Sequence, residues 1–298
     1  MDVVSDVVEV ARCGRAVHGR AGFDGPWRFR FSTCRGVGFH VLLRGSGWLV
    51  PERGEPLPLG VGDVVLAPRL GGHVLSDLPV SEGAVPFSAV GASRGSGEGG
   101  AVDLLCGEYP LDGSRSHPLL EALPEVVHLP ARVGGHRDLR AAVDLLGREV
   151  RAGRSGRDAL VSGLLDLVLV YSLRAWLEDN PDGGWARALR DEGVASVLDA
   201  LHTSPAEQWR IEVLADRAGM SRATLARRFT ALTGRSPMAY LAWWRMVLAS
   251  KLLKETELPL HGVAQRVGYS SPFAFSHAFK RYNGVAPAHY RSAAADLR

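Results

Sequence analysis

The chain has 298 residues, a hydrophobic content of 46% and a net charge of +3, which favours two packed domains over one. Its three cysteines are too few for a disulfide framework. The sequence shows neither an apolar run of about 18 residues nor a signal-peptide pattern at its start, so we expect no membrane segment. These features predict a protein of the bacterial cytoplasm.

The first part of the chain, to about residue 130, has short apolar runs between Gly and Pro turns, which is typical of a small sandwich or barrel of β-strands. The clearest runs cover residues 27–31, 37–43, 63–68 and 101–106. Residues 2–12 have the pattern of a short amphipathic helix, which we expect to pack on the edge of this β domain. Residues 91–100 have the composition of a flexible loop.

Residues 136–178 change to a helical period and predict an α-hairpin. The first helix face is formed by Leu139, Val143, Leu146 and Val150. The second is formed by Leu160, Leu164, Leu167 and Val168, and it is widened by Val161, Leu165, Leu169 and Trp176. A helix with so wide an apolar face is either deeply buried or paired with another chain, and we favour a homodimer surface over plain core.

The segment 178–184 combines Pro, Gly and charged residues and indicates an interdomain linker. We therefore predict an N-terminal domain at residues 1–178, a linker at 179–188 and a C-terminal domain at 189–298. Charge differs between the two ends of the chain. Residues 185–298 hold 16 Lys and Arg against 9 Asp and Glu, a net charge of +7, whereas the preceding residues carry −4. This asymmetry indicates that the C-terminal part meets a polyanion.

The C-terminal part contains an internal repeat. Ala215, Arg217 and Gly219 recur 49 positions later, and Phe229, Gly234, Pro237 and Tyr240 recur 50 positions later. The extra residue falls between the turn and the end of the following helix. A repeat of this kind in an otherwise unrepeated chain indicates a duplicated helical module.

Each repeat has the pattern of a helix-turn-helix unit. In the first, a helix at 211–218 is followed by Gly219 for the turn and by Ser221 as the cap of a helix at 222–232. In the second, a helix at 260–267 precedes Gly268, and Ser270 or Ser271 caps a helix at 272–282. The second helix of each pair is expected to enter a major groove with its N-terminal, outward residues.

A single helix is predicted between the two units, at residues 237–255. At 1.5 Å per residue it spans about 28 Å. Major-groove faces of B-DNA repeat about every 34 Å, so a rigid helix of this length suits two recognition helices near that repeat.

The C-terminal motifs resemble those of the AraC/XylS family of transcription regulators. The resemblance covers residues 214–241 and 263–291, and in the second stretch it includes Val267-Gly268-Tyr269, the pair Phe275 and Phe279, and the final P-x-x-Y-R. It implies binding to double-stranded DNA. By position, bases would be contacted by Ala223, Ala226 and Arg227 from the first recognition helix and by Pro272, Phe273, Ser276 and His277 from the second.

Further residues complete the predicted DNA contact set: Ser221, Arg222, Arg228, Ser271, Lys280 and Arg281. Arg227 is the best candidate for guanine, because its fork matches O6 and N7, and Ala223 and Ala226 offer only methyl contacts. The second helix departs from the family's frequent polar pattern at Phe273 and His277.

The N-terminal part resembles the cupin-like sensor half of the same family, on residues 39–49 and 59–77. Gly62, Pro68 and His73 follow the second cupin motif, with Leu70 where Gly is usual. The first motif needs an H-x-H pair and a Glu, but His40 is followed by Val41 and Leu42. The standard three-His metal centre is therefore incomplete, and we expect no metal and no cofactor.

Two signals are considered for the sensor half. In the first, Cys106 is a primary thiol for an oxidant, with Cys13 or Cys34 as its resolving partner. In the second, the cysteines are inert, and a small organic ligand inside the barrel is contacted by His40, His73 and Trp48.

The combined prediction is a multidomain α+β protein with a cupin-like β-barrel, an α-hairpin and an all-α domain of two helix-turn-helix units. It would act as a transcription activator or repressor, contacting RNA polymerase in the first case. Catalytic motifs such as G-x-S-x-G, H-E-x-x-H and the Walker loop are missing, so no enzyme is predicted. The alternatives are a metal-dependent cupin oxygenase tethered to DNA and a DNA-architectural protein.

Overall fold

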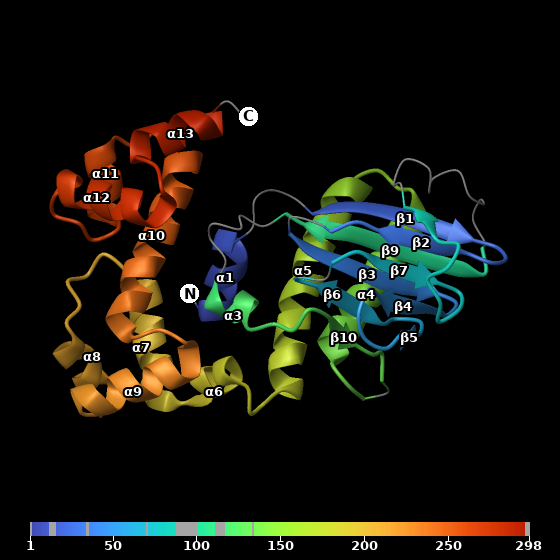
Figure 1. Cartoon of the computed structure of the whole chain (residues 1–298), viewed down its shortest axis with the longest axis horizontal. Helices are drawn as coiled ribbons and strands as arrows, with labels where there is room; N and C mark the ends of the chain where they lie inside the picture. Colours follow the sequence, from blue (N-terminus) through green and yellow to red (C-terminus); the bar gives the residue numbers. More distant parts are fainter. Residues whose placement is uncertain are drawn as a thin grey trace. The chain divides into compact units, whose positions relative to one another are not determined.

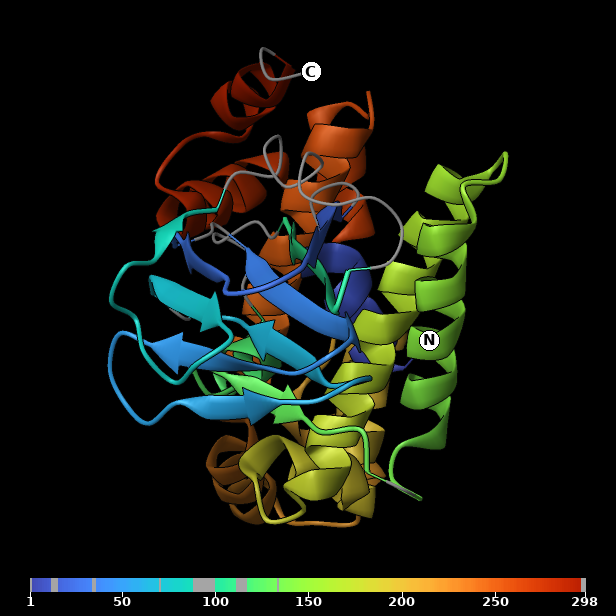
Figure 2. The same cartoon turned by 90° about the vertical axis from the view of Figure 1, so that its right-hand side faces the viewer.

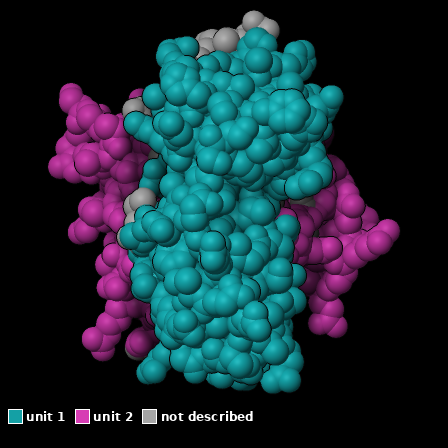
Figure 3. Space-filling model, turned by 90° about the vertical axis from the view of Figure 1, so that its left-hand side faces the viewer, with its two compact units in different colours: residues 1–11, 117–119, 180–298 teal, residues 12–116, 120–179 magenta. Residues whose placement is uncertain are grey.

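The computed structural model describes residues 2–11, 16–33, 36–69, 71–87, 100–110, 117–132 and 134–295. The chain divides into two compact units, shown in teal and magenta in Figure 3. We call them the helical unit, residues 1–11, 117–119 and 180–298, and the β unit, residues 12–116 and 120–179.

The β unit contains two five-stranded sheets (Figure 1). Its strands are β1 (Val17–Phe23), β2 (Arg28–Phe31), β3 (Val37–Arg44), β4 (Gly47–Pro51), β5 (Leu57–Leu59), β6 (Val64–Ala67), β7 (His73–Ser76), β8 (Val85–Pro86), β9 (Val102–Tyr109) and β10 (Val127–Leu129). One sheet has the order β1-β9-β3-β6-β10 and the other β5-β4-β7-β2-β8. All pairings are antiparallel except that of β2 with β8. The core between them includes Leu42, Leu49, Leu75 and Leu104.

The four apolar runs of the sequence form β2, β3, β6 and β9, so the predicted β domain is confirmed. β3 and β9 are paired along their length, with His40 opposite Cys106. Every residue of β6 and β7 is buried, as expected of short strands that are covered on both faces. The loop predicted at residues 91–100 lies almost wholly outside the described residues.

The predicted α-hairpin consists of α4 (Arg137–Ala152) and α5 (Arg157–Asp179), which pack side by side (Figure 2). α4 contacts β3, α5 contacts β10, and the Tyr109 hydroxyl donates a hydrogen bond to the Leu165 carbonyl at 2.7 Å. The apolar face of α5 is buried at Val161, Leu164, Leu165 and Val168. Leu160 and Leu167, which were expected on that face, are instead 53% and 47% exposed.

By length and composition α5 is also long and apolar enough to cross a membrane. Length and composition are weak evidence for a membrane-spanning helix, because the core helix of a soluble protein meets the same criterion. Half of its most apolar 18-residue window is buried within the structure.

The helical unit contains α1 (Val3–Ala11), α6 (Gly184–Arg190), α7 (Glu192–Thr203), α8 (Ile211–Arg217), α9 (Arg222–Thr233), α10 (Pro237–Glu255), α11 (Leu260–Arg266), α12 (Pro272–Asn283) and α13 (Pro287–Ala295). The short helix α3 (Pro118–Glu121) begins in this unit. α10 forms as one helix over the predicted residues and contacts α7, α9, α11, α12 and α13. It is therefore the scaffold of the unit.

The predicted helix at the start of the chain does form, as α1, but its place differs from the prediction. α1 contacts α7 and α10 and belongs to the helical unit. Val3 and Val7 on its inner side are buried, and the Lys251 ammonium of α10 contacts the Glu9 carboxylate at 2.6 Å. Burial of the apolar side of α1 explains why the first residues belong to the helical unit.

The helical unit is not continuous in sequence. It resumes at Asn180 after the β unit, and it also contains residues 1–11 and 117–119. The second half of the expected linker, residues 184–188, lies in the helix α6, in which Trp185, Ala186 and Ala188 are buried. Its apolar residues pack this segment against α7 and α9.

Candidate DNA-binding site

The first helix-turn-helix unit is formed by α8 and α9. Gly219 takes a positive φ of 63°, which only glycine adopts without strain, and it turns the chain between the two helices. Ser221 then caps α9, because its side chain accepts a hydrogen bond from the Thr224 amide at 3.2 Å. Leu225 and Phe229 face the core and fix which side of α9 is outward.

The second helix-turn-helix unit is formed by α11 and α12, and it also has a glycine at the turn and a serine as the helix cap. Gly268 has a φ of 79°, and Ser271 is the cap of α12, accepting from the Ala274 amide at 3.3 Å. Pro272 occupies the first turn, where the missing amide proton costs nothing. Phe275 and Phe279 are fully buried beneath the helix.

Arg245 of α10 connects the two helix-turn-helix units. Its guanidinium donates to the carbonyls of Pro205 and Glu207, both at 2.7 Å, in the segment that leads into α8. A side chain at Gly268 would approach the Arg245 guanidinium to 2.6 Å, so glycine is also required there for packing. The turn of the second unit thus lies against the loop before the first.

The outward face of α9 contains three cationic residues. Arg222, Arg227 and Arg228 are exposed. Arg222 forms an ion pair with Glu212 at 2.9 Å, and Arg228 forms one with Asp191, the cap of α7. Among the described residues, no hydrogen bond or ion pair partner is found for the Arg227 side chain. The structure therefore leaves Arg227 available to a ligand and engages its two neighbours.

The outward residues of α12 differ in chemistry. Pro272, Phe273 and His277 are exposed, and Ser276 is half-buried with its hydroxyl donating to the Pro272 carbonyl at 2.8 Å. Lys280 and Arg281 are exposed near the C-terminal end of α12. Every predicted DNA-contact residue thus lies on α9, on α12 or at one of their caps.

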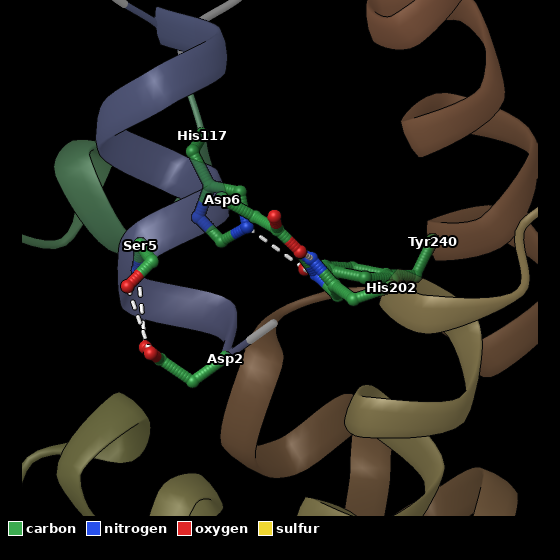
Figure 4. A network of polar contacts seen from close by, with 6 residues as sticks. All are labelled: Asp2, Ser5, Asp6, His117, His202 and Tyr240. Atoms are coloured by element: carbon green, nitrogen blue, oxygen red, sulfur yellow. Dashed lines mark hydrogen bonds and ion pairs between the residues drawn. The ribbon is translucent and has the colours of Figure 1, made fainter.

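A buried polar network joins the first residues of the chain to the helical core (Figure 4). The Asp6 carboxylate contacts His202 Nδ1 at 2.9 Å, and His202 Nε2 lies 2.7 Å from the Tyr240 hydroxyl. That hydroxyl lies 2.8 Å from His117 Nε2, and His117 Nδ1 accepts from the Leu119 amide at 3.0 Å. All four side chains of the network are buried.

The hydrogen bonds of this network can all be satisfied in one direction. Because His117 Nδ1 accepts, its Nε2 carries the proton and donates to Tyr240. Tyr240 then donates to His202 Nε2, and His202 Nδ1–H donates to the Asp6 carboxylate. Burial, together with His202 and Arg235, lowers the pKa of His117 well below its usual value, which keeps it neutral. Burial also raises the pKa of Tyr240, so its hydroxyl keeps its proton.

The β unit contains a cavity of about 290 Å³. Its walls include the start of β1 at Val17 and the end of β9 at Cys106 and Glu108. His40 and His73 line it too, with their Nε2 atoms 2.7 Å apart. Burial lowers the pKa of both imidazoles, and in His40 the neighbouring His73 adds to the effect. Two neutral histidines sharing one hydrogen bond leave the buried Nδ1 of His40 without a partner among the described residues.

The structure thus brings together three of the residues named for signal sensing, His40, His73 and Cys106. Trp48 lies on β4, opposite Ser76 and Pro58, and does not line this cavity. Cys13 and Cys34 lie outside the described residues. Cys106 is buried, and this burial raises the pKa of its thiol, so the reactive thiolate is disfavoured at neutral pH.

Among the described residues, no three His, Cys, Asp or Glu side chains lie close enough to hold a metal ion. Asp63 is one acidic group near a histidine, 3.0 Å from His128 Nε2. It also accepts from the amides of Gly60 and Ala131, and these contacts together lower its pKa despite burial. Asp63 therefore anchors two loops of the β unit.

Two helix-turn-helix units on one helical scaffold, joined in one chain to a two-sheet β unit, define a DNA-binding protein with a separate N-terminal domain. A cupin family model matches residues 2–178, and a helix-turn-helix domain model matches residues 214–293. The chain belongs to the AraC family of transcription regulators.

Two relatives match nearly the whole length of the chain. A putative AraC-like transcription regulator of Streptomyces lividans is 35% identical over 298 residues, which is 98% of each chain. The transcriptional regulator MtrA of Neisseria gonorrhoeae is 32% identical over 301 residues, again 98% of each chain. A solved structure, the DNA-binding domain of AdpA in complex with a target DNA, is 40% identical, covers 36% of this chain and 96% of that one, and has a TM-score of 0.35.

The sequence motifs located both recognition helices but not the polar network. Asp6 and His202 are separated by 196 positions, and neither lies in a recognisable motif. The one available signal was that residues 2–12 form an amphipathic helix, which predicts burial of one side but not its partner.

Proposed function

We propose that this regulator recognises specific base pairs through the outward residues of α9 and α12. The observation that carries the proposal is that the predicted base-contacting residues, Arg227 and Phe273 among them, are outward on helices fixed by caps and buried anchors. The exposed Lys280 and Arg281 would contact phosphates, which position a protein without reading sequence.

The test of base reading is selection of duplexes from a random library by the full-length chain, followed by affinity measurement at two salt concentrations. We expect enrichment of one motif and binding that weakens steeply with salt. Equal affinity for selected and random duplexes would instead support the architectural alternative.

We also propose that the cavity in the β unit binds a small, mostly apolar organic effector with a polar group for His40. Support comes from the cavity's size, its aromatic and aliphatic lining, and the unpartnered His40 Nδ1. The strands also connect the cavity to the helical unit by sequence. β1 follows α1, and β9 precedes His117, and both α1 and His117 belong to the helical unit.

A compound screen by thermal shift on the full-length chain tests this site. Hits should stabilise the wild type by mass action but not Ala67→Met, which fills the cavity. Ala21→Met, at a buried alanine that does not line the cavity, controls for the general effect of overpacking. Hits that stabilise Ala67→Met as much as the wild type would place the effector elsewhere.

We further propose that the regulator is a cytoplasmic homodimer that contacts RNA polymerase where it activates, and that it is not an enzyme. The dimer surface would include Leu160 and Leu167, one helical repeat of seven apart and both exposed on α5. Sedimentation of the wild type against Leu160→Glu with Leu167→Glu tests it. We expect a dimer for the wild type and a folded monomer for the variant, whereas a wild-type monomer at micromolar concentration would contradict the proposal.

A further inference from the structure

Phe273 is the most exposed large apolar side chain of the described residues, at 75%. It lies in the first turn of α12, two positions after the cap Ser271. In the same helix Phe275 and Phe279 are fully buried and fix the helix to its core. The fold therefore does not use Phe273 for packing, although an aromatic ring of that size is costly to leave in water.

The exposed face of α12 places Phe273 at one end and positive charge at the other. His277 lies one turn after Phe273, with ring centroids 4.5 Å apart. Lys280 follows on the same face, since positions three, four and seven apart share a side of a helix. α12 has no acidic residue. This face thus combines an apolar tip, supported by an imidazole, with cations suited to phosphate.

A phenyl ring has no hydrogen-bond donor or acceptor, so it cannot read the polar pattern of base edges. The apolar feature of the major groove is the C5 methyl group of thymine. We propose that Phe273 recognises a thymine methyl group, so that the second unit reads DNA by apolar contact where the first uses Arg227. This inference rests on the proposed entry of α12 into a major groove.

Two other uses of an exposed aromatic are less consistent with the site. Wedges that part base steps belong mostly to proteins of the minor groove, whereas the second helix of this motif is placed in the major groove. An apolar contact with a protein partner would not need the flanking Lys280 and Arg281. Both uses predict no dependence on the thymine methyl.

The experiment uses full-length protein and duplexes selected from a random library. In the selected duplex, each thymine is replaced in turn by deoxyuridine, which lacks only the methyl group. Affinities are measured for the wild type, for Phe273→Ala and for Phe273→Leu, which keeps an apolar side chain. Val285→Ala removes a different exposed apolar group of the helical unit and is the matched control.

We expect one or two thymines at which deoxyuridine weakens wild-type binding about fourfold, the effect of one buried methyl group. Phe273→Ala should lose this sensitivity at those positions, Phe273→Leu should keep part of it, and Val285→Ala should keep all of it. Because Phe273 is exposed, thermal denaturation of the Phe273 variants should match that of the wild type.

Three results would overturn the inference. In the first, wild-type affinity does not change when deoxyuridine replaces thymine at any position. In the second, Phe273→Ala still binds the deoxyuridine duplexes about fourfold more weakly. In the third, Phe273→Ala loses the same affinity for selected and for random duplexes. A library that yields no enriched duplex overturns the proposed base reading itself, and this inference with it.

Discussion

The recognition helices α9 and α12 occupy equivalent places in the two halves of the repeat but present different chemistry. At an offset of 50, Ala223 corresponds to Phe273, Arg227 to His277, and the anchors Leu225 and Phe229 to Phe275 and Phe279. The inward residues are thus apolar in both helices, and the outward ones are not alike. Packing constrains the inward side of a duplicated helix, whereas its outward side can diverge to suit a different half of the DNA site.

Substitution of a buried anchor should have the same effect in both helix-turn-helix units. Phe229→Ala and Phe279→Ala should each destabilise the helical unit by about 3–5 kcal/mol, the usual cost of removing a fully buried phenyl group. Chemical denaturation of the full-length chain measures both. A small loss in only one variant would mean that the two cores are not equivalent.

Tyr240 and Tyr290 occupy equivalent positions in the two repeats, but their substitution should change stability by different amounts. Tyr240→Phe should cost about 1–3 kcal/mol, because it leaves His117 and His202 buried without their shared partner. Tyr290, its equivalent, has a hydroxyl with no partner among the described residues, so Tyr290→Phe should be nearly neutral. Denaturation measures both variants, and an equal loss of unfolding free energy in the two would contradict a stabilising role for the network.

The outward residues of α9 and α12 should differ in whether they contact bases or phosphates. Arg227→Ala should lose about 1–3 kcal/mol of discrimination at one or two base pairs, as expected of a bidentate contact with guanine. Arg281→Ala, near the end of α12, should weaken selected and random duplexes alike. Competition binding with single base-pair changes measures both, and a uniform loss in Arg227→Ala would contradict direct readout.

The polar network around Tyr240, in the first half of the repeat, also predicts a pH dependence. The pKa of His117 is lowered in the fold, so below the unfolded value near 6.5 the unfolded chain binds the extra proton first. Stability should be full above pH 6.5 and should decrease as the pH falls from there toward the folded pKa. His117→Gln should flatten part of this decrease in pH-dependent thermal denaturation, and an identical profile would exclude His117 as its source. The exposed His261→Gln is the control.

The smallest effect is expected in the β unit, at Cys106. Cys106→Ser should leave the response of a reporter gene to hypochlorite or peroxide unchanged, since burial raises the pKa of this thiol and disfavours the thiolate. A lost response would restore Cys106 as an oxidant sensor and would argue against the ligand proposed for the cavity.

The sequence predicted what is determined locally. Gly219 and Gly268 mark turns, Ser221 marks a cap, and the 3.6-residue period marks the anchors, so both helix-turn-helix units and α10 could be located. The strands followed from apolar runs and turns. The exposure of Leu160 and Leu167 could not be predicted, because α5 is apolar on more than one face and the period does not show which side meets α4.

Contacts between distant segments were also beyond prediction. Proximity of His40 and His73 depends on which strands meet across two sheets, and the same uncertainty led to the grouping of Trp48 with them. The partner of α1 was assigned to the wrong unit, because an amphipathic pattern shows that one side is buried but not what covers it.

The location of α1 has a consequence for synthesis of the chain. α1 leaves the ribosome before the β unit, but its partners α7 and α10 leave after it, and the Asp6–His202 contact joins positions 196 apart. Domains usually fold in the order in which they are made, so the β unit is complete while the helical unit still lacks most of its residues. The helical unit encloses the β unit in sequence, so α1 can be covered only after α7 and α10 have been made. A chain terminated before α7 would therefore leave Val3 and Val7 uncovered, and chaperones and proteases would recognise this apolar surface.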